Sequence, residues 1–258
     1  MSFINDLVMD IYYSYRLGND AKLDECLYAD IRGGEQPRIR RRDELPRKSE
    51  SKTRIIVISD THQRHDVIGD LPEGDIFIHA GDVFMSSQRV SHSRGVKNLK
   101  EFNEWLGSVR CRRRIVVSGN HDGVMQALGT KGVQEVLSNA TYLENSSTNV
   151  GDLKIWGSPL SHGRSRNDAF QSGEFYEATR NEALCSTDVD ILVTHGPCFQ
   201  LQDTMRPALH IWGHAHGYHG IHFPGQKLFN HKLSCVSINA CIMDGKYNPS
   251  NCPVVIDL

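Results

Sequence analysis

The sequence predicts an α/β domain that extends from residue 54 to residue 258. Five short, nearly continuous apolar runs are typical of strands that are covered on both faces of a sheet. Several segments between these runs space their apolar residues by three or four, as surface helices do. Each of the five runs ends at a polar residue of a type that binds metal ions. Since open α/β sheets build their active sites at the carboxyl ends of strands, these runs also indicate where a site would lie.

The elements follow one another in a regular order. Strands are expected at 54–59, 75–81, 114–119, 190–194 and 209–213, with later strands at 233–239 and 254–257. Helices are expected over 96–106, 124–128 and 133–137, where apolar residues recur at helical spacing. The stretch 149–156 indicates a hairpin that turns at Gly151-Asp152.

Residues 1–53 are expected to form a helical and basic extension ahead of this domain. Apolar residues between Phe3 and Tyr12 recur at helical spacing, and a second helix is expected over Asp20–Tyr28. The basic segment 38–48 is interpreted as a solvated linker, and the alternative is a contact for an acidic lipid, RNA or protein partner. Salt-sensitive binding that is lost on deleting residues 1–50 would favour the contact.

Composition narrows the class of protein. The chain has 39% hydrophobic and 23% charged residues, a balance typical of soluble globular proteins. Its formal net charge of −2 gives no argument for nucleic acid binding. No apolar stretch approaches the ~20 residues of a membrane helix, and the start lacks the features of a signal peptide. Seven scattered cysteines without a Cys-x-x-Cys pair suit reduced thiols, so a cytoplasmic location is expected.

The polar residues after the five runs have the chemistry of metal ligands. Asp60 and His62 are expected to leave their strand in extended conformation, which would direct both side chains to one ion. Gly81 and Gly119 directly precede candidate ligands, where a tight turn would exclude a side chain. Imidazoles combined with two carboxylates and an amide oxygen suit two divalent ions of Mn, Fe, Zn or Co better than Mg or Ca.

Taken singly, most of these motifs are common, but their combination is specific. Asp60-x-His62, Gly81-Asp82, Gly119-Asn120-His121-Asp122, Thr194-His195-Gly196-Pro197 and Gly213-His214-x-His216 together resemble the signature of the calcineurin-like metallophosphoesterase superfamily. Trp156-Gly157-Ser158-Pro159 and Asn167-Asp168-Ala169-Phe170 resemble its branch of metallophosphoesterase-domain-containing proteins, which is related to class III cyclic-nucleotide phosphodiesterases. The resemblance covers Arg54 to Leu258 and implies a four-layer αββα sandwich of two mixed sheets flanked by helices.

The resemblance also implies roles for individual residues. The first metal would be held by Asp60, His62 and His216, the second by Asn120, His195 and His214, and Asp82 would bridge the two. His121 would contact the phosphate and protonate the leaving group, and Asp122 would orient His121.

The expected reaction is hydrolysis of a small phosphodiester, such as a cyclic nucleotide, by a hydroxide between the two ions. The alternatives are a phosphomonoesterase or phosphoprotein phosphatase, and a non-catalytic scaffold of the same fold. Arg164 could clamp a phosphate oxygen or be a solvated loop charge. His79 is interpreted as a core histidine, and Trp156, Phe170 and Phe175 as packing residues rather than a nucleobase platform.

Overall fold

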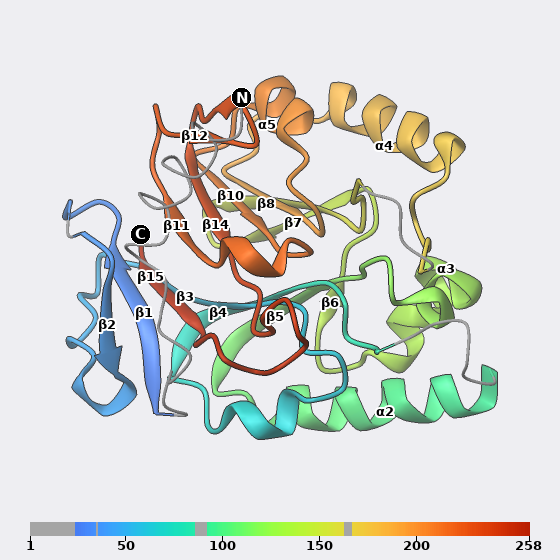
Figure 1. Cartoon of the computed structure of the whole chain (residues 1–258), viewed down its shortest axis with the longest axis horizontal. Helices are drawn as coiled ribbons and strands as arrows, with labels where there is room; N and C mark the ends of the chain where they lie inside the picture. The colour runs from blue at the N-terminus through green and yellow to red at the C-terminus, as the bar shows by residue number, and fades with distance from the viewer. Residues whose placement is uncertain (1–23, 35, 86–91, 163–166) are drawn as a thin grey trace.

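The computed structural model describes residues 24–34, 36–85, 92–162 and 167–258. The helix expected between Phe3 and Tyr12 and the candidate clamp Arg164 lie outside these ranges. Two mixed β-sheets pack face to face, and helices cover the outer face of each, as Figure 1 shows with α2 below and α4 and α5 above. The expected four-layer αββα sandwich is therefore confirmed.

The first sheet has the strand order β2-β1-β15-β3-β4-β5-β6. Its strands are β1 (Glu25–Asp30), β2 (Arg38–Arg41), β3 (Arg54–Ile58), β4 (Gly74–Ala80), β5 (Cys111–Val117), β6 (Thr141–Tyr142) and β15 (Val254–Asp257). Strands β3 to β6 are parallel, whereas β15 runs antiparallel to β3 and parallel to β1.

The second sheet has the order β11-β14-β10-β9-β8-β7. Its strands are β7 (Ser146–Val150), β8 (Leu153–Ser158), β9 (Ile191–Thr194), β10 (Leu209–Trp212), β11 (Gly220–His222) and β14 (Val236–Asn239). The central four strands are parallel and the two edge strands antiparallel. A small ribbon joins β12 (Lys227–Leu228) to β13 (His231–Lys232).

The helices are α2 (His92–Ser108), α3 (Gly123–Val136), α4 (Gly173–Cys185) and α5 (Phe199–Met205), with short 3-10 turns η2 (Arg42–Glu44), η3 (His65–Ile68) and η4 (His216–Tyr218). Helix α3 is broken at Gly129, whose φ of 68° only glycine adopts readily. This break separates the two short helices that the apolar spacing predicts in this stretch. None of the helices in the described ranges combines the length and apolar character that crossing a bilayer requires.

The continuous apolar runs are explained by burial on both faces of the strands. On β3, Ile55 and Val57 pack between the two sheets, whereas Ile56 and Ile58 pack under α2 and α3. This alternation with a period of two lets one strand contribute to two cores. All five predicted strands that precede candidate ligands are present, as is the hairpin between β7 and β8.

The helix expected over Asp20–Tyr28 is wrong in its described part. Glu25–Asp30 form strand β1 instead of a helix, and β2 pairs with it, so both belong to the first sheet (Figure 1). Cys26 and Tyr28 pack in one core and Leu27 and Ala29 in the other. Four consecutive buried residues cannot be covered on one stripe of a surface helix, which is why the strand is favoured.

Candidate metal centre

The candidate ligands lie where the two sheets meet at the carboxyl ends of their parallel strands. Asp60, Asp82 and Asn120 follow β3, β4 and β5 in the first sheet. His195 and the His214-Ala215-His216 segment follow β9 and β10 in the second. The fold therefore brings seven side chains from five segments to one place, including His62, which lies two residues after Asp60.

Three of these side chains form one ligand group. The Nε2 atom of His216 lies 3.2 Å from Asp60 Oδ1 and 3.4 Å from His62 Nε2. All three side chains are at least partly buried, and their ligand atoms lie within 4.8 Å of one another. This spacing fits one ion.

A second group surrounds Asp82. Its Oδ1 lies 3.2 Å from His195 Nε2, and Asn120 Oδ1 lies 3.0 Å from the same nitrogen and 2.8 Å from His214 Nδ1. Asp82 Oδ2 also lies 3.8 Å from His62 Nε2 in the first group. The carboxylate of Asp82 therefore stands between the two groups.

Main-chain carbonyls fix the orientation of the ligand imidazoles. The Nδ1–H groups of His62, His195 and His216 donate to the carbonyls of Phe84, Ala80 and Asp244, at 2.8, 2.9 and 2.9 Å. Since a neutral imidazole has one donor and one acceptor nitrogen, each Nε2 lone pair then faces inward. Such outer hydrogen bonds are typical of metal-binding histidines.

His214 and Asn120 are oriented in the same way by other carbonyls. His214 uses Nε2 to reach the His162 carbonyl at 3.0 Å, which leaves Nδ1 as its inward atom. The amide nitrogen of Asn120 donates to the Asn167 carbonyl at 2.8 Å and so directs Oδ1 into the site.

This arrangement fits a cation better than it fits hydrogen bonds alone. When His62 and His216 are neutral, with the proton on Nδ1 as in a metal-bound histidine, they present two acceptor lone pairs to each other, and the oxygen of Asn120 and the carboxylates are acceptors too. Converging acceptors repel one another unless positive charge lies between them. The mixed set of imidazole, carboxylate and amide oxygen suits a divalent transition metal.

The electrostatics of the two carboxylates support the same interpretation. Burial alone would raise the pKa of Asp60, but His216 and the other histidines hold it well below its usual range. Burial would likewise raise the pKa of Asp82, but His195 and His62 hold it down. Both carboxylates are therefore ionised, and, against the opposing effect of burial, they in turn raise the pKa of His216 and raise that of His195 to about 9. Without an ion, protons on these two histidines balance the buried negative charge, and a bound cation would replace them.

The backbone of the ligand turns is left-handed, and the extended conformation expected for Asp60-Thr61-His62 is wrong. Asp60, His62, Asp82 and His214 have φ values of 53°, 45°, 56° and 66°. Non-glycine residues in this region cost of order 1–3 kcal/mol each and cluster at functional sites. The two side chains of Asp60 and His62 still reach one group, but through a strained turn.

Glycines directly before the ligands leave no room for a side chain. A Cβ on Gly119 would lie 2.3 Å from Asp82 Oδ1, and one on Gly81 would lie 2.5 Å from His195 Nδ1. A Cβ on Gly213 would lie 2.3 Å from Asp60 Oδ2. The expectation that Gly81 and Gly119 exclude a side chain beneath the ligands is therefore confirmed.

His121 lies beside both ligand groups. Its ring centroid is 4.6 Å from that of His62, and its Nε2 lies 3.9 Å from Asp82 Oδ2. Its Nδ1–H donates to the Met85 carbonyl at 2.6 Å. The Asn167 amide nitrogen lies 3.4 Å from Nε2.

Asp122 does not orient His121 as expected. Its carboxylate instead accepts the main-chain N–H groups of Val83, Phe84 and Gly119 at 3.2, 2.9 and 2.8 Å. Burial and the neighbouring Asp82 raise the pKa of Asp122 to about 7. Asp122 therefore ties together the turns that carry Asp82 and Asn120, and the Met85 carbonyl orients His121.

Several residues at the site were not predicted. Cys241 Sγ lies 3.0 Å from Asp60 Oδ2, and the Ser59 hydroxyl donates to the same oxygen. The Tyr247 ring lies 4.9 Å from His62 and 5.0 Å from His216, and it is 39% exposed. Cys241 follows the carboxyl end of β14, so its position was available from the strand pattern, whereas no pattern marks Tyr247.

The remaining interpretations concern residues of the core. His79 is fully buried and contacts the Thr61 hydroxyl at 3.0 Å, as a core histidine. Trp156 and Phe170 are also fully buried, and Phe175 packs against the cluster of Trp156. These aromatic side chains pack the fold, as interpreted from the sequence.

The αββα fold and the two groups of candidate ligands can be compared with known families. A family model described as calcineurin-like phosphoesterase matches residues 53–218. The chain therefore belongs to the calcineurin-like phosphoesterase family.

Relatives place it in the branch that the motifs resemble. Human metallophosphoesterase domain-containing protein 1 is 30% identical, over 86% of this chain and 77% of its own length. A Caenorhabditis elegans UPF0046 protein is 28% identical, over 81% of this chain and 82% of its own length. A solved crystal structure overlays 73% of this chain and 90% of its own, with a TM-score of 0.52 and 14% identity, which is a likeness of fold alone.

Proposed function

We propose that the protein is a phosphodiesterase that uses two divalent metal ions to hydrolyse a small phosphodiester, such as a cyclic nucleotide. The observation that carries this proposal is the convergence of seven ligand side chains with the His121 imidazole beside them. Asp60, His62 and His216 would hold one ion, Asn120, His195 and His214 the other, and Asp82 both. When bound, Mn, Fe, Zn or Co ions would supply positive charge for the phosphate and lower the pKa of a water.

His121 is proposed to give a proton to the departing oxygen. Since its Nδ1–H donates to the Met85 carbonyl, Nε2 is the ring atom that can exchange a proton with the substrate. The Asn167 amide nitrogen, 3.4 Å away, can donate to Nε2 only after this atom has given up its proton, so it would stabilise the deprotonated ring. Asp122 would act as a positioning residue for the turns after β4 and β5.

A diester is favoured over a monoester by two features. The chain resembles the branch related to class III cyclic-nucleotide phosphodiesterases. In addition, the exposed Tyr247 ring lies beside His62, His216 and His121, where it would offer an apolar face to an organic leaving group. The free cysteines further support a proposal that the protein works in a reducing compartment such as the cytoplasm.

Substitution of His121 tests the mechanism. The variant His121→Ala should lower kcat on bis(4-nitrophenyl) phosphate by about 10²–10⁴, the usual worth of a general acid, while its metal content remains near that of the unchanged protein. His92→Ala, an exposed position on α2, is the matched control. Unchanged turnover in His121→Ala would remove this residue from the mechanism. A strong preference for 4-nitrophenyl phosphate over diesters would overturn the substrate class.

A further inference from the structure

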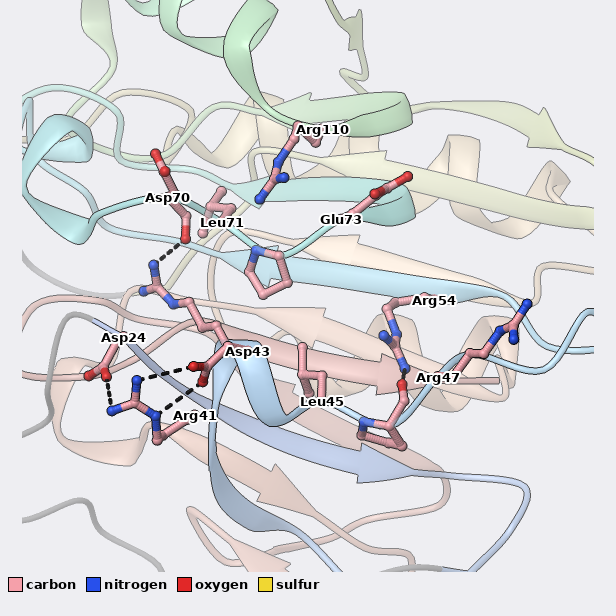
Figure 2. A pocket seen from close by; sticks show the side chains of 13 residues that line it. Asp24, Arg41, Asp43, Leu45, Arg47, Arg54, Asp70, Leu71, Glu73 and Arg110 are labelled. Atoms are coloured by element: carbon pink, nitrogen blue, oxygen red, sulfur yellow. Dashed lines mark hydrogen bonds and ion pairs between the residues drawn. The ribbon is translucent and has the colours of Figure 1, made fainter.

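A charged cavity away from the metal centre balances its own charges. This cavity of about 540 Å³ lies at the other end of the first sheet and is lined by five arginines and four carboxylates (Figure 2). Arg41 pairs there with Asp24 at 2.6 Å and with Asp43 at 3.1 Å, and Arg54 pairs with Asp257 at 2.7 Å. The cavity therefore has no excess of charge for a ligand, whereas the metal centre has a buried contact without an assigned role.

This contact joins a buried thiol to a candidate metal ligand. Cys241 Sγ lies 3.0 Å from Asp60 Oδ2, and both residues are fully buried. Because an ionised carboxylate can only accept hydrogen bonds, the thiol is the donor. Among the described residues, Cys241 belongs to none of the clusters of candidate ligand atoms. Any effect of Cys241 on an ion must therefore pass through Asp60.

Two further donors reach the same oxygen of Asp60. The Ser59 hydroxyl donates to Oδ2, and the main-chain nitrogen of His214 lies 2.9 Å from Oδ2 and 3.1 Å from Oδ1. A carboxylate has about four acceptor positions on its two oxygens, so three donors saturate Oδ2. Oδ1 lies 3.2 Å from His216 Nε2, within the first ligand group, which also contains His62. Oδ1 is therefore the oxygen of Asp60 that remains to hold an ion.

The space around these donors is closed. A Cβ on Gly213 would lie 1.9 Å from Ser59 Oγ and 2.3 Å from Asp60 Oδ2. Ser59 and Asp60 have no exposed surface. Solvent therefore has no access to Asp60 Oδ2, and removal of a donor leaves this charged oxygen short of a partner.

The main chain holds Cys241 in place from both sheets. Ser59, which follows β3 of the first sheet, forms an isolated β-bridge with Cys241, which follows β14 of the second. The Cys241 N–H donates to Asn239 Oδ1 at 3.0 Å, and Asn251 Nδ2 donates to the Cys241 carbonyl at 3.0 Å. Asn239 Nδ2 also donates to the Ala215 carbonyl at 2.8 Å, in the ligand turn after β10. The thiol is thus fixed relative to ligand turns of both sheets.

We propose that Cys241 is a positioning residue for the ion of the first ligand group. Its thiol, together with the Ser59 hydroxyl, occupies Asp60 Oδ2, so that Asp60 binds the ion through Oδ1 alone. Outer hydrogen bonds of this kind orient ligands and commonly contribute about 10–100-fold to metal affinity. This inference rests on the two ions of the proposed function, but it concerns the binding of one ion and can be measured without turnover.

Calorimetric titration of the metal-free full chain with Mn tests this role. The binding step that disappears in His62→Ala identifies the ion of the first ligand group. Cys241→Ala, which removes the donor, should weaken this step by about 10–100-fold. Cys241→Ser keeps a donor on the same side chain and should recover most of the affinity. If Cys241→Ala does not fold, Cys241→Val fills the space of the thiol without a donor and gives the same test.

The matched control is Cys26→Ala, which removes another fully buried thiol of the first sheet, on β1 and away from the ligand turns. It should leave both Mn steps unchanged. Equal weakening in Cys26→Ala and Cys241→Ala would show a general effect of losing a buried thiol and overturn the role of Cys241. An unchanged first-group step in Cys241→Ala, or equal weakening in Cys241→Ala and Cys241→Ser, would overturn it as well.

The proposed phosphodiesterase reaction can fail separately from this inference. A protein that binds Mn in two steps, loses affinity in Cys241→Ala and does not hydrolyse bis(4-nitrophenyl) phosphate would contradict the reaction and support the role of Cys241. A protein that hydrolyses this diester but keeps its Mn affinity in Cys241→Ala would support the reaction and overturn the role of Cys241.

Discussion

Alanine at Gly119 would test whether the turn after β5 is shaped by the metal centre. The new methyl group would lie 2.3 Å from Asp82 Oδ1, 2.6 Å from the Asp82 main-chain nitrogen and 2.7 Å from His195 Cε1. Ordinary contacts begin at 3.4 Å, so Asp82 must move by about 1 Å. Because the Asp82 carboxylate stands between the two ligand groups, both would be disturbed.

The expected loss is larger in metal binding and turnover than in stability. A displaced ligand environment typically costs about 10–100-fold in metal affinity. A misplacement of ~1 Å can lower the reaction rate by about 10²-fold even with the ions present. Overpacking of this kind costs about 1–3 kcal/mol of unfolding free energy, which a domain of this size can tolerate.

Three measurements separate these effects: metal content by elemental analysis, kcat on a diester at saturating Mn, and the free energy of unfolding in urea. Gly173→Ala is the matched control, because a Cβ there meets no atom within 4 Å and the residue begins helix α4. We expect Gly173→Ala to match the unchanged protein in all three. Wild-type metal affinity and turnover in Gly119→Ala would refute the reasoning that this glycine makes room for the ligands.

Three further predictions concern stability. Asp257→Ala should lower the free energy of unfolding by about 3–5 kcal/mol, because the buried Arg54 loses its carboxylate; a loss under about 1 kcal/mol in urea would contradict this. Burial, aided by His231, lowers the pKa of His210 to about 3, so between ~pH 6.5 and pH 3 the unfolded chain binds a proton that the folded chain does not. The free energy of unfolding should therefore decrease as the pH is lowered, and His210 should account for about 1.3 kcal/mol of this decrease between pH 7 and pH 5.5. His210→Gln should show a smaller decrease, and an equal decrease in both proteins would contradict this role of His210. Chelation with EDTA should abolish diester hydrolysis and lower the melting temperature, since a ligand at 100 times its Kd stabilises the folded state by about 2.7 kcal/mol. If protein incubated with Mn melts at the same temperature with and without EDTA, the folded chain does not bind the ion.

The central strands were predictable because their signal is local. The run from Ile55 to Ile58 is apolar at every position, and only a strand between two cores buries such a run. The place of the ligands followed from the same pattern, because parallel strands bring their carboxyl ends together. Asp60 and Asp82 could thus be assigned to one site before their distances were known.

The parts that failed depend on information that is not local. Strand β1 is stabilised by β15, and Tyr28 donates to Asp257 across 229 positions of sequence, so the local spacing around Tyr28 could not identify it. The role of Asp122 depends on how the turns after β4 and β5 approach each other in the fold. Because Asp122 is next to His121 in the sequence, the local pattern suggested a contact with His121 instead. The left-handed turns at Asp60 and His62 are likewise set by tertiary contacts, against ordinary backbone preference.

The position of β15 between β1 and β3 has a consequence for how the chain assembles. Strand β15 is made after every other described strand, yet it joins the outer pair β1 and β2 to the rest of the first sheet. During synthesis, β1 and β2 therefore cannot join the rest of the first sheet until the chain has been made as far as Asp257. Ordering over such a long separation in sequence is slow, so a nascent chain would carry an exposed sheet edge at β3 for most of its synthesis.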